Sequence, residues 1–296
     1  MIRMRVKRNL GDALFDWGNV ILMLFICFIT LYPIWYVLIN SFNDGVDAMR
    51  GGIYWLPRVF SLESYEAVFK NKGLMTSMGV TVAKTLIGTV VHVLFTAMVA
   101  YGISRKDLIG RNLYMLIGTI TMFFGGGLIP TYLLMRDLHL LDNFMVYIIP
   151  AMFSFFDLII FTTFFRDIPE GMEEAAKIDG ANDLKIFFRI VLPVSMPVLA
   201  TIAMFHGVFQ WNDYFTAVIY TNNAALQPIQ TFLYRIVALS GSNQIASVVP
   251  GNVVRTVTSQ SVKLATMVIT TVPIVMVYPF LQKYFVKGFM IGSMKG

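Results

Sequence analysis

Five ionisable side chains lie inside long apolar stretches of this chain, where they could bind or move charge: Lys84, His92, Asp157, His206 and Asp213. A charged group in lipid is costly, so it marks a functional site or a structural ion pair. We expect Lys84 and Asp213 to lie near membrane edges, where a polar end reaches water cheaply. Asp157 lies near the middle of its stretch. It is equally suited to an interhelical contact, with Lys84 or His92, and to a place in a solute path.

The stretch around Asp213 also carries groups that suit sugar recognition. Aromatic faces stack on sugar rings, and amide groups hydrogen-bond to hydroxyls. With Asp157, these residues form the candidate translocation path: Asp157, Gln210, Trp211, Asn212, Asp213 and Tyr214. Aromatic belts at membrane interfaces have the same composition, so an interfacial role is the alternative.

The motifs of common enzyme classes are absent from the sequence. No GxxxxGK(S/T) phosphate loop occurs, since the run from Gly292 to Gly296 lacks the spacing and the Ser or Thr that must follow. Neither HExxH nor GxSxG is present. The single Cys27 excludes an intramolecular disulfide and a cysteine metal site, and the three histidines are scattered. We therefore expect no catalytic residue, no metal site and no cofactor in this chain.

The loop at residues 166–194 has the clearest local signals outside the apolar stretches. Pro169 suits the first turn of a helix, acidic residues follow it, and Asp179-Gly180 is a stop and turn signal. A second short helix ends at Pro193, with an apolar stripe formed by Leu184, Phe187, Phe188 and Val191. The pattern predicts a helix-turn-helix, and a plain surface connector is the alternative.

The elements that position these groups follow from composition. Of the 296 residues, 57% are hydrophobic and 14% are charged, whereas a soluble domain carries about 25% charged residues. A helix needs about 20 apolar residues to cross a bilayer. Six stretches are long enough: 17–43, 74–104, 112–135, 143–165, 195–221 and 264–282. Lipid offers unpaired backbone groups no partner, so the fold class is all-α, a polytopic membrane protein with six transmembrane helices.

Lysine and arginine counts predict the orientation. With the N-terminus inside, the inside segments hold 14 basic residues and the outside loops hold 7. Both termini are then cytoplasmic. The basic start predicts a signal anchor rather than a cleaved signal peptide, because the apolar run after it is too long. The net charge of +6 therefore reflects topology and membrane lipid rather than nucleic acid.

Two further patterns concern an outside loop and the third stretch. In the loop at 43–73, the apolar spacing over residues 62–69 predicts a short amphipathic helix that lies on the membrane or packs on the bundle. Gly125 to Gly127, followed by Pro130, should loosen the third stretch. The glycines either act as a hinge or allow close packing of helices.

The charged loop resembles the EAA signature of bacterial ATP-binding cassette (ABC) importer permeases. The matching residues are Glu174-Ala175-Ala176, Asp179-Gly180-Ala181, Phe187, Leu192-Pro193 and Pro197. The chain is also similar to carbohydrate importer permeases of the maltose type at Asn40-Ser41-Phe42, Trp211-Asn212-Asp213 and the C-terminal run 282–296. The runs Gly125 to Pro130 and Tyr278-Pro279-Phe280 resemble the oligosaccharide and polysaccharide-fragment branch of that family.

The resemblance implies a type I ABC importer permease fold with a coupling helix that docks in a cleft of an ATPase. The residues implied in ATPase coupling are Glu173, Glu174, Ala175, Ala176, Asp179, Gly180 and Ala181. The end of the chain, with Lys295 and Gly296, resembles a tail that reaches between the ATPases, and a frayed basic end is the alternative. ATP and magnesium are then expected on the ATPase and not on this chain.

The resemblance also implies a set of partners and a location. The partners are a second homologous permease subunit, two ABC ATPase subunits, an extracytoplasmic sugar-binding protein and an oligosaccharide substrate. The location is the bacterial cytoplasmic (inner) membrane. We divide the chain into an N-terminal part at 1–73, a permease core at 74–290 with its coupling helix at 169–193, and a tail at 291–296.

Two other functions compete with ATP-driven sugar import. An ion-coupled secondary transporter could use Asp157, Asp213 and Lys84 as its ion path, but six stretches without an inverted repeat fit it poorly. A membrane scaffold that transports nothing would tolerate loss of every intramembrane charge. Neither alternative explains the helix-turn-helix, so the sequence favours an importer permease.

Overall fold

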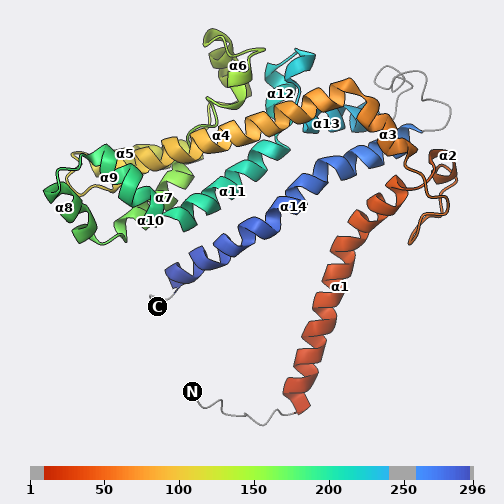
Figure 1. Cartoon of the computed structure of the whole chain (residues 1–296), viewed down its shortest axis with the longest axis horizontal. Coiled ribbons are helices and arrows are strands. Elements are labelled where there is room, and N and C mark those ends of the chain that lie inside the picture. The colour runs from red at the N-terminus through yellow and green to blue at the C-terminus, as the bar shows by residue number, and fades with distance from the viewer. Residues whose placement is uncertain (1–9, 240–257, 294–296) are drawn as a thin grey trace. The chain divides into compact units, whose positions relative to one another are not determined.

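The computed structural model describes residues 10–239 and 258–293, and these residues form helices joined by short loops. Figure 1 gives the order of the helices along the chain. The chain divides into two compact units, which are described separately. The first comprises residues 1–70 and 240–269, and the second comprises residues 71–239 and 270–296.

The first unit contains α1, a 32-residue helix at Leu10–Ser41 that includes Pro33. It also contains α2 (Gly45–Ala48), α3 (Glu63–Lys70) and the part of α14 (Ser259–Ser293) up to Ile269. An antiparallel bridge joins Asn43 to Phe60. Helix α3 confirms the short helix predicted in this loop, and it buries Ala67 and Val68.

The second unit is organised around α4, a 33-residue helix at Lys72–Ser104. The other elements, in which η1 and η3 are 3-10 helices and η2 is a π-helix, are α5 (Arg111–Phe123), α6 (Leu128–Asp137), η1 (Phe144–Tyr147), α7 (Phe155–Arg166), α8 (Glu170–Ile178), α9 (Asp183–Ile186), η2 (Phe187–Val191), α10 (Leu192–Val194), α11 (Met196–Asn212), α12 (Phe215–Tyr220), η3 (Ala224–Leu226) and α13 (Ile229–Leu239). Helix α4 packs along α7 and α11, and Figure 1 shows α4 and α11 side by side. Their contact forms the larger core, with Ala97, Leu158, Phe161 and Ile202 fully buried.

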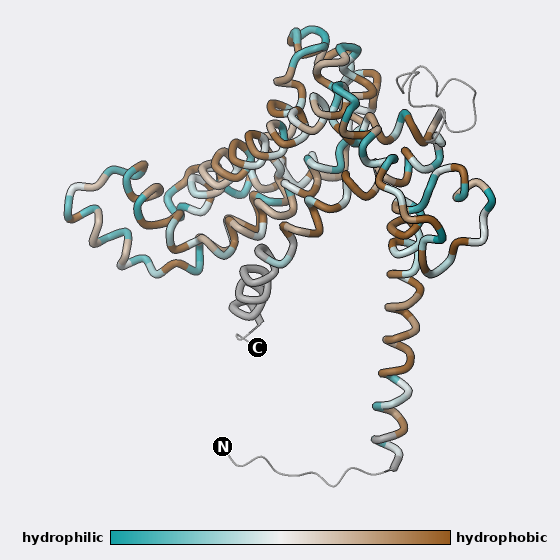
Figure 2. Tube along the Cα trace, turned by 45° about the vertical axis from the view of Figure 1, so that its right-hand side comes forward, coloured by the Kyte–Doolittle hydropathy of each residue, from teal (hydrophilic) through white to brown (hydrophobic). Residues whose placement is uncertain are grey.

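Three helices of the described ranges are long and apolar enough to cross a membrane alone. They are α1 from Leu14 to Ser41, α4, and α14 from Gln260 to Val277. Two bent pairs of helices are also long and apolar enough when each pair is counted as one crossing. They are α5 with α6, and Asp183–Val194 with α11. Figure 2 shows hydrophobic residues running along much of α1.

The third predicted stretch is interrupted where its glycines lie. Helix α5 ends at Phe123, α6 begins at Leu128, and the two helix axes are bent by 115°. Gly127 has φ +81°, a backbone angle that glycine adopts without strain. The structure therefore confirms that the glycine run loosens this stretch.

The fourth predicted stretch is not one helix. A 3-10 helix ends at Tyr147, and α7 begins only at Phe155, with Ser154 as its N-cap. Asp157 lies in the first turn of α7, after the break in this stretch. Apolar composition predicted a continuous crossing here, but the backbone between residues 148 and 154 leaves the helical conformation.

Candidate functional site

The charged loop folds as the predicted helix-turn-helix. Pro169 precedes α8, Asp179 ends it, and Gly180 follows with φ +76°. The N–H of Ala181 donates to the C=O of Ala176 at 2.9 Å, the pattern that closes a helix with a left-handed glycine. No atom lies within 4 Å of a Cβ built on Gly180. Backbone conformation, and not crowding within this chain, therefore calls for glycine at this position.

The second half of the loop is one helical run with a π-helical turn in it. Asn182 caps α9 by accepting a hydrogen bond from the N–H of Lys185 at 2.9 Å. The predicted apolar stripe is right in part. Phe187 and Val191 are buried, whereas Leu184 and Phe188 are 59% and 50% exposed. The π turn rotates the later residues relative to a regular α-helix, which a fixed spacing of three and four does not predict.

Arg105, at the C-terminal end of α4, ties both helices of the loop to the core. Its guanidinium donates to the Glu173 carboxylate, and it donates to Oδ1 of Asp183 at 3.1 Å. It also donates to the Tyr101 hydroxyl and lies 4.5 Å from the centroid of that ring. One side chain thus links α4, α8 and α9.

A second ion pair of this region is exposed to solvent. Lys106 pairs with Glu170, and both side chains are largely exposed. The hydrogen bond from Lys106, with its charge, holds the pKa of the Glu170 carboxyl below its ordinary value. Exposed pairs of this kind are screened and contribute little to stability.

The residues proposed for coupling divide between two sides of the loop. Glu174, Ala175, Asp179 and Gly180 are exposed. Glu173 is turned inward to Arg105, and Ala176 and Ala181 pack against the larger core. Ile178, which adjoins the exposed set, is 86% exposed. An apolar and acidic face is thereby presented away from the unit.

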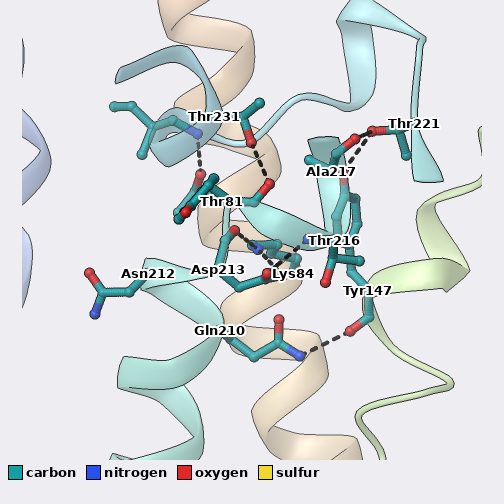
Figure 3. Close-up of polar contacts among 12 residues, drawn as sticks. Thr81, Lys84, Tyr147, Gln210, Asn212, Asp213, Thr216, Ala217, Thr221 and Thr231 are labelled. Carbon is teal, nitrogen blue, oxygen red and sulfur yellow. Dashed lines mark hydrogen bonds and ion pairs between the residues drawn. The ribbon is translucent and has the colours of Figure 1, made fainter. Parts of the chain in front are cut away.

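Lys84 is fully buried within the second unit. Its Nζ donates to the backbone O of Asp213 at 2.7 Å and to Oδ2 at 3.1 Å, and it lies 4.9 Å from the centroid of the Tyr147 ring. Asp213 also accepts a hydrogen bond from the N–H of Thr216 at the start of α12 (Figure 3). The prediction that snorkelling relieves these charges is wrong for Lys84, because an internal ion pair does so.

The interhelical contact predicted between Asp157 and His92 is confirmed. Nε2 of His92 lies 2.9 Å from Oδ2 of Asp157, and Nδ1 lies 2.8 Å from the backbone O of Ala151. A carbonyl oxygen only accepts, so Nδ1 donates and the other nitrogen shares one proton with the carboxylate. His206 stacks on the His92 ring with centroids 3.8 Å apart.

Side chains of α4 and α11 also satisfy carbonyl oxygens at the end of η1 and in the irregular segment that follows it. Nε2 of Gln210 donates to the O of Tyr147 at 2.9 Å, and Oγ1 of Thr96 donates to the O of Met152 at 3.4 Å. Gly88 makes room for this arrangement, since a Cβ there would lie 3.0 Å from Nε2 of Gln210. Irregular backbone at membrane depth requires such partners.

The remaining candidates for the translocation path differ in their accessibility. Nε1 of Trp211 donates to the O of Thr270 at 3.1 Å, within the second unit. Asn212 is exposed, and Figure 3 shows it pointing away from the Lys84–Asp213 pair. Tyr214 is 40% exposed and stacks on Tyr234 with centroids 4.9 Å apart.

Three comparisons with known proteins agree on the family. Residues 10–291 match the family described as "Binding-protein-dependent transport system inner membrane component". The chain belongs to this family. The permease is 41% identical over 293 residues, 98% of this chain and 100% of the relative, to the polygalacturonan/rhamnogalacturonan transport system permease protein YtcP of Bacillus subtilis. It is 28% identical, over 98% of this chain and 100% of the relative, to the arabinooligosaccharides transport system permease protein AraQ of Halalkalibacterium halodurans.

A solved structure extends the likeness to the fold. It is a bacterial ABC transporter involved in the import of the acidic polysaccharide alginate, and the permease matches one of its chains with TM-score 0.88 and 32% sequence identity. The match covers 95% of this chain and 99% of that chain. The permease is therefore a helical, multi-pass inner membrane protein, and the ATPase activity of the system lies in a separate subunit.

The two site residues predicted in the C-terminal tail, Lys295 and Gly296, lie outside the described residues. Within the described ranges, no group of three or more His, Cys, Asp or Glu residues is arranged to hold a metal ion. The sequence analysis named Lys84 and His92 but not the stripe of buried small and polar residues on α4 to which they belong, spaced by three or four: Ser77, Thr81, Lys84, Gly88, His92 and Thr96. That spacing in an apolar helix was the available signal.

Proposed function

We propose that this chain is one of two permease subunits of an ATP-driven ABC importer that takes up oligosaccharides. It pairs with a second, homologous permease, and two ATPase subunits bind the cytoplasmic loops of the pair. A sugar-binding protein delivers the substrate from outside. The relatives named for the transport of polygalacturonan, arabinooligosaccharides and alginate support a sugar substrate, in particular a fragment of a polysaccharide.

The observation that carries the proposal is the two-sided coupling loop. One side is fixed to α4 through Arg105 and Glu173, and the other presents Glu174, Ala175, Asp179 and Gly180. A short rigid element with small residues on its free face suits insertion into a cleft of the ATPase. Closure of the ATPases on ATP would then shift the permease between inward-facing and outward-facing states, since ATP binds one state more tightly.

The topology that suits this function has six crossings with both termini in the cytoplasm. The third crossing would use α5 and α6, the fourth residues 143–166, and the fifth α11 with α12. The N-terminal part at 1–73 and the tail at 291–296 would flank a permease core at 74–290. The tail is a second candidate contact with the ATPases.

Among the candidates for the translocation path, we assign solute contact to Asn212 and Tyr214, which are exposed. Gln210, Trp211, Asp213 and Asp157 bond to other elements of the same unit, so we assign them to positioning. The same contacts weigh against an ion-coupled transporter, because its proposed ion path consists of groups already paired.

The coupling role is tested by two substitutions of Gly180 in the assembled importer. Gly180→Trp adds bulk to the docking face, whereas Gly180→Asn keeps a residue that tolerates a left-handed backbone and serves as its matched control. Glu174→Lys reverses a charge on the same face, with Glu63→Lys, an exposed reversal in α3, as control. We expect Gly180→Trp and Glu174→Lys to lose ATPase pull-down and binding-protein-stimulated hydrolysis. If both remain intact, the coupling role is wrong.

A further inference from the structure

The loop between α2 and α3 folds back along α1. Nε1 of Trp35 donates to the backbone O of Trp55 at 3.1 Å. The Trp55 ring centroid lies 5.5 Å from that of Tyr32 and 6.1 Å from that of Phe28. These contacts place Trp55 beside the C-terminal half of α1 rather than beyond its end. All of them lie within the first unit.

The contacts with Phe28 and Tyr32 fix the depth of Trp55 in a bilayer. The apolar segment of α1 runs from Leu14 to Ser41, 28 residues or about 42 Å at the helical rise of ~1.5 Å per residue. A hydrocarbon core about 30 Å thick is shorter than this segment. Phe28 and Tyr32 lie about 21 and 27 Å from Leu14, and about 20 and 14 Å from Ser41. They are therefore inside the core whichever end of the segment marks its boundary.

Three carbonyl oxygens of the loop accept hydrogen bonds from side chains of the first unit. The O of Trp55 is satisfied by Trp35, and the O of Ile53 accepts a hydrogen bond from Nδ2 of Asn40 at 3.4 Å. Nearer the start of the loop, Nη2 of Arg58 donates to the O of Gly51 at 2.8 Å. Non-helical backbone persists at membrane depth only where protein groups supply such partners.

The side chains divide the loop into an apolar tip and a polar base. Tyr54, Trp55 and Leu56 are 57%, 59% and 73% exposed. This apolar tip adjoins α1, in which residues 14–38 are exposed or half-buried. At the base, a hydrogen bond from Asn43, together with Arg58, holds the pKa of the Asp47 carboxyl below its ordinary value. A charged base and an aromatic tip are typical of an element that stands in the membrane interface.

We propose that residues 53–57 enter the bilayer beside α1, with Trp55 and Leu56 in contact with lipid acyl chains. The loop is thus a membrane-dipping anchor that fixes the height of the outer segment between α1 and α4. The inference uses the assignment of α1 as a membrane crossing, which belongs to the proposed function.

The test is fluorescence quenching by brominated lipids in vesicles that contain the complete importer. A bimane label is placed on Leu56→Cys or on Met49→Cys, each in a Cys27→Ser background. Leu56 and Met49 are both 73% exposed, so they form a matched pair that differs in predicted depth. The native Cys27, which is exposed on α1, carries the label in a third sample and reports whether α1 contacts lipid.

We expect brominated lipid to quench the label at residue 56 as strongly as at Cys27 and about threefold more than at residue 49, because bromine lies in the hydrocarbon core. Aqueous iodide should reverse the order of residues 56 and 49. Quenching at 56 that matches residue 49, or quenching at 56 by neither agent, overturns the proposal, and the second result assigns the tip to a protein contact. Weak lipid quenching at Cys27 overturns the assignment of α1 itself.

Discussion

The second unit contains two sets of charges that are paired in different surroundings. Between α4 and the end of α11, the side chains of Lys84 and Asp213 are 0% and 10% exposed. At the end of α4, the side chains of Arg105, Glu173 and Asp183 are 23%, 18% and 71% exposed. Both sets join helices that are distant in sequence. Only the second can exchange its partners for water.

The difference teaches which contacts hold the fold and which can move. Removing one partner of a buried pair leaves an uncompensated charge and costs several kcal/mol, whereas an exposed pair is worth about 0–1 kcal/mol. We therefore assign the buried pairs to the fixed frame of the permease. The Arg105 contacts, which are less buried than the Lys84–Asp213 pair, suit a joint between the frame and the coupling helix.

The largest expected effect is that of Lys84→Met. It leaves Asp213 buried without its partner, and we expect the importer to lose about 3–5 kcal/mol of stability against unfolding. The measurement is chemical unfolding of the purified complex. The double variant Lys84→Met with Asp213→Asn removes both charges and should regain most of the loss. A single variant as stable as the double would refute the buried-pair account.

A smaller loss is expected for His92→Phe, which keeps a ring of similar shape but removes the hydrogen bonds to Asp157 and Ala151. Hydrogen bonds to charged groups suggest a cost of about 2 kcal/mol. Thr96→Val is the matched control, because it removes one long bond to the same segment and should cost about 1 kcal/mol or less. Equal unfolding midpoints for the two variants would show that the histidine contact does not hold this segment.

Arg105→Ala should change coupling more than stability. We expect about 1–2 kcal/mol of destabilisation, between the values for an exposed and for a buried pair, since Glu173 is only 18% exposed. The ratio of sugar taken up to ATP hydrolysed should fall about fivefold, the lower end of typical coupling energies. Arg105→Lys should restore this ratio only in part. Lysine lacks the planar, forked guanidinium that bonds to both Glu173 and Asp183. An unchanged ratio in Arg105→Ala would show that the contacts of Arg105 with Glu173 and Asp183 play no part in coupling.

The smallest effect is expected for Lys106→Ala, the exposed control for Arg105. The unfolding midpoint and the coupling ratio at pH 7 should match those of the unmodified importer. Because the pKa of Glu170 lies below its ordinary value of 4.5, the pair is fully present above that value and is lost only as the pH falls through the lowered pKa. A midpoint difference between the two proteins that changes between pH 6 and 8 would contradict this assignment.

Sequence reasoning succeeded where the signals are local. Pro169 and Asp179-Gly180 mark the start and the stop of α8, and each acts through its own backbone. The glycines before Leu128 interrupt the third stretch for the same reason. Such residues dictate structure without reference to distant parts of the chain.

It failed where partners come from distant elements. Apolar composition predicted a helix through residues 148–154, and Pro150 was the one local sign of a break. The irregular backbone is permitted by hydrogen bonds from His92, Thr96 and Gln210, which are distant in sequence. The Lys84–Asp213 pair spans 129 positions, so nothing near either residue reveals the other. The polar stripe on α4 shows which face is buried but not which group it meets.

The most direct test of the whole account is sugar uptake by vesicles that contain the importer with both Lys84→Met and Asp213→Asn. In the proposed mechanism the Lys84–Asp213 pair belongs to the fixed frame of the permease, and ATP supplies the driving force. This mechanism predicts that uptake remains close to that of the unmodified importer, requires ATP inside the vesicles and is unaffected by an ionophore. Uptake that disappears in an assembled double variant, or that runs on an ion gradient without ATP, would contradict it.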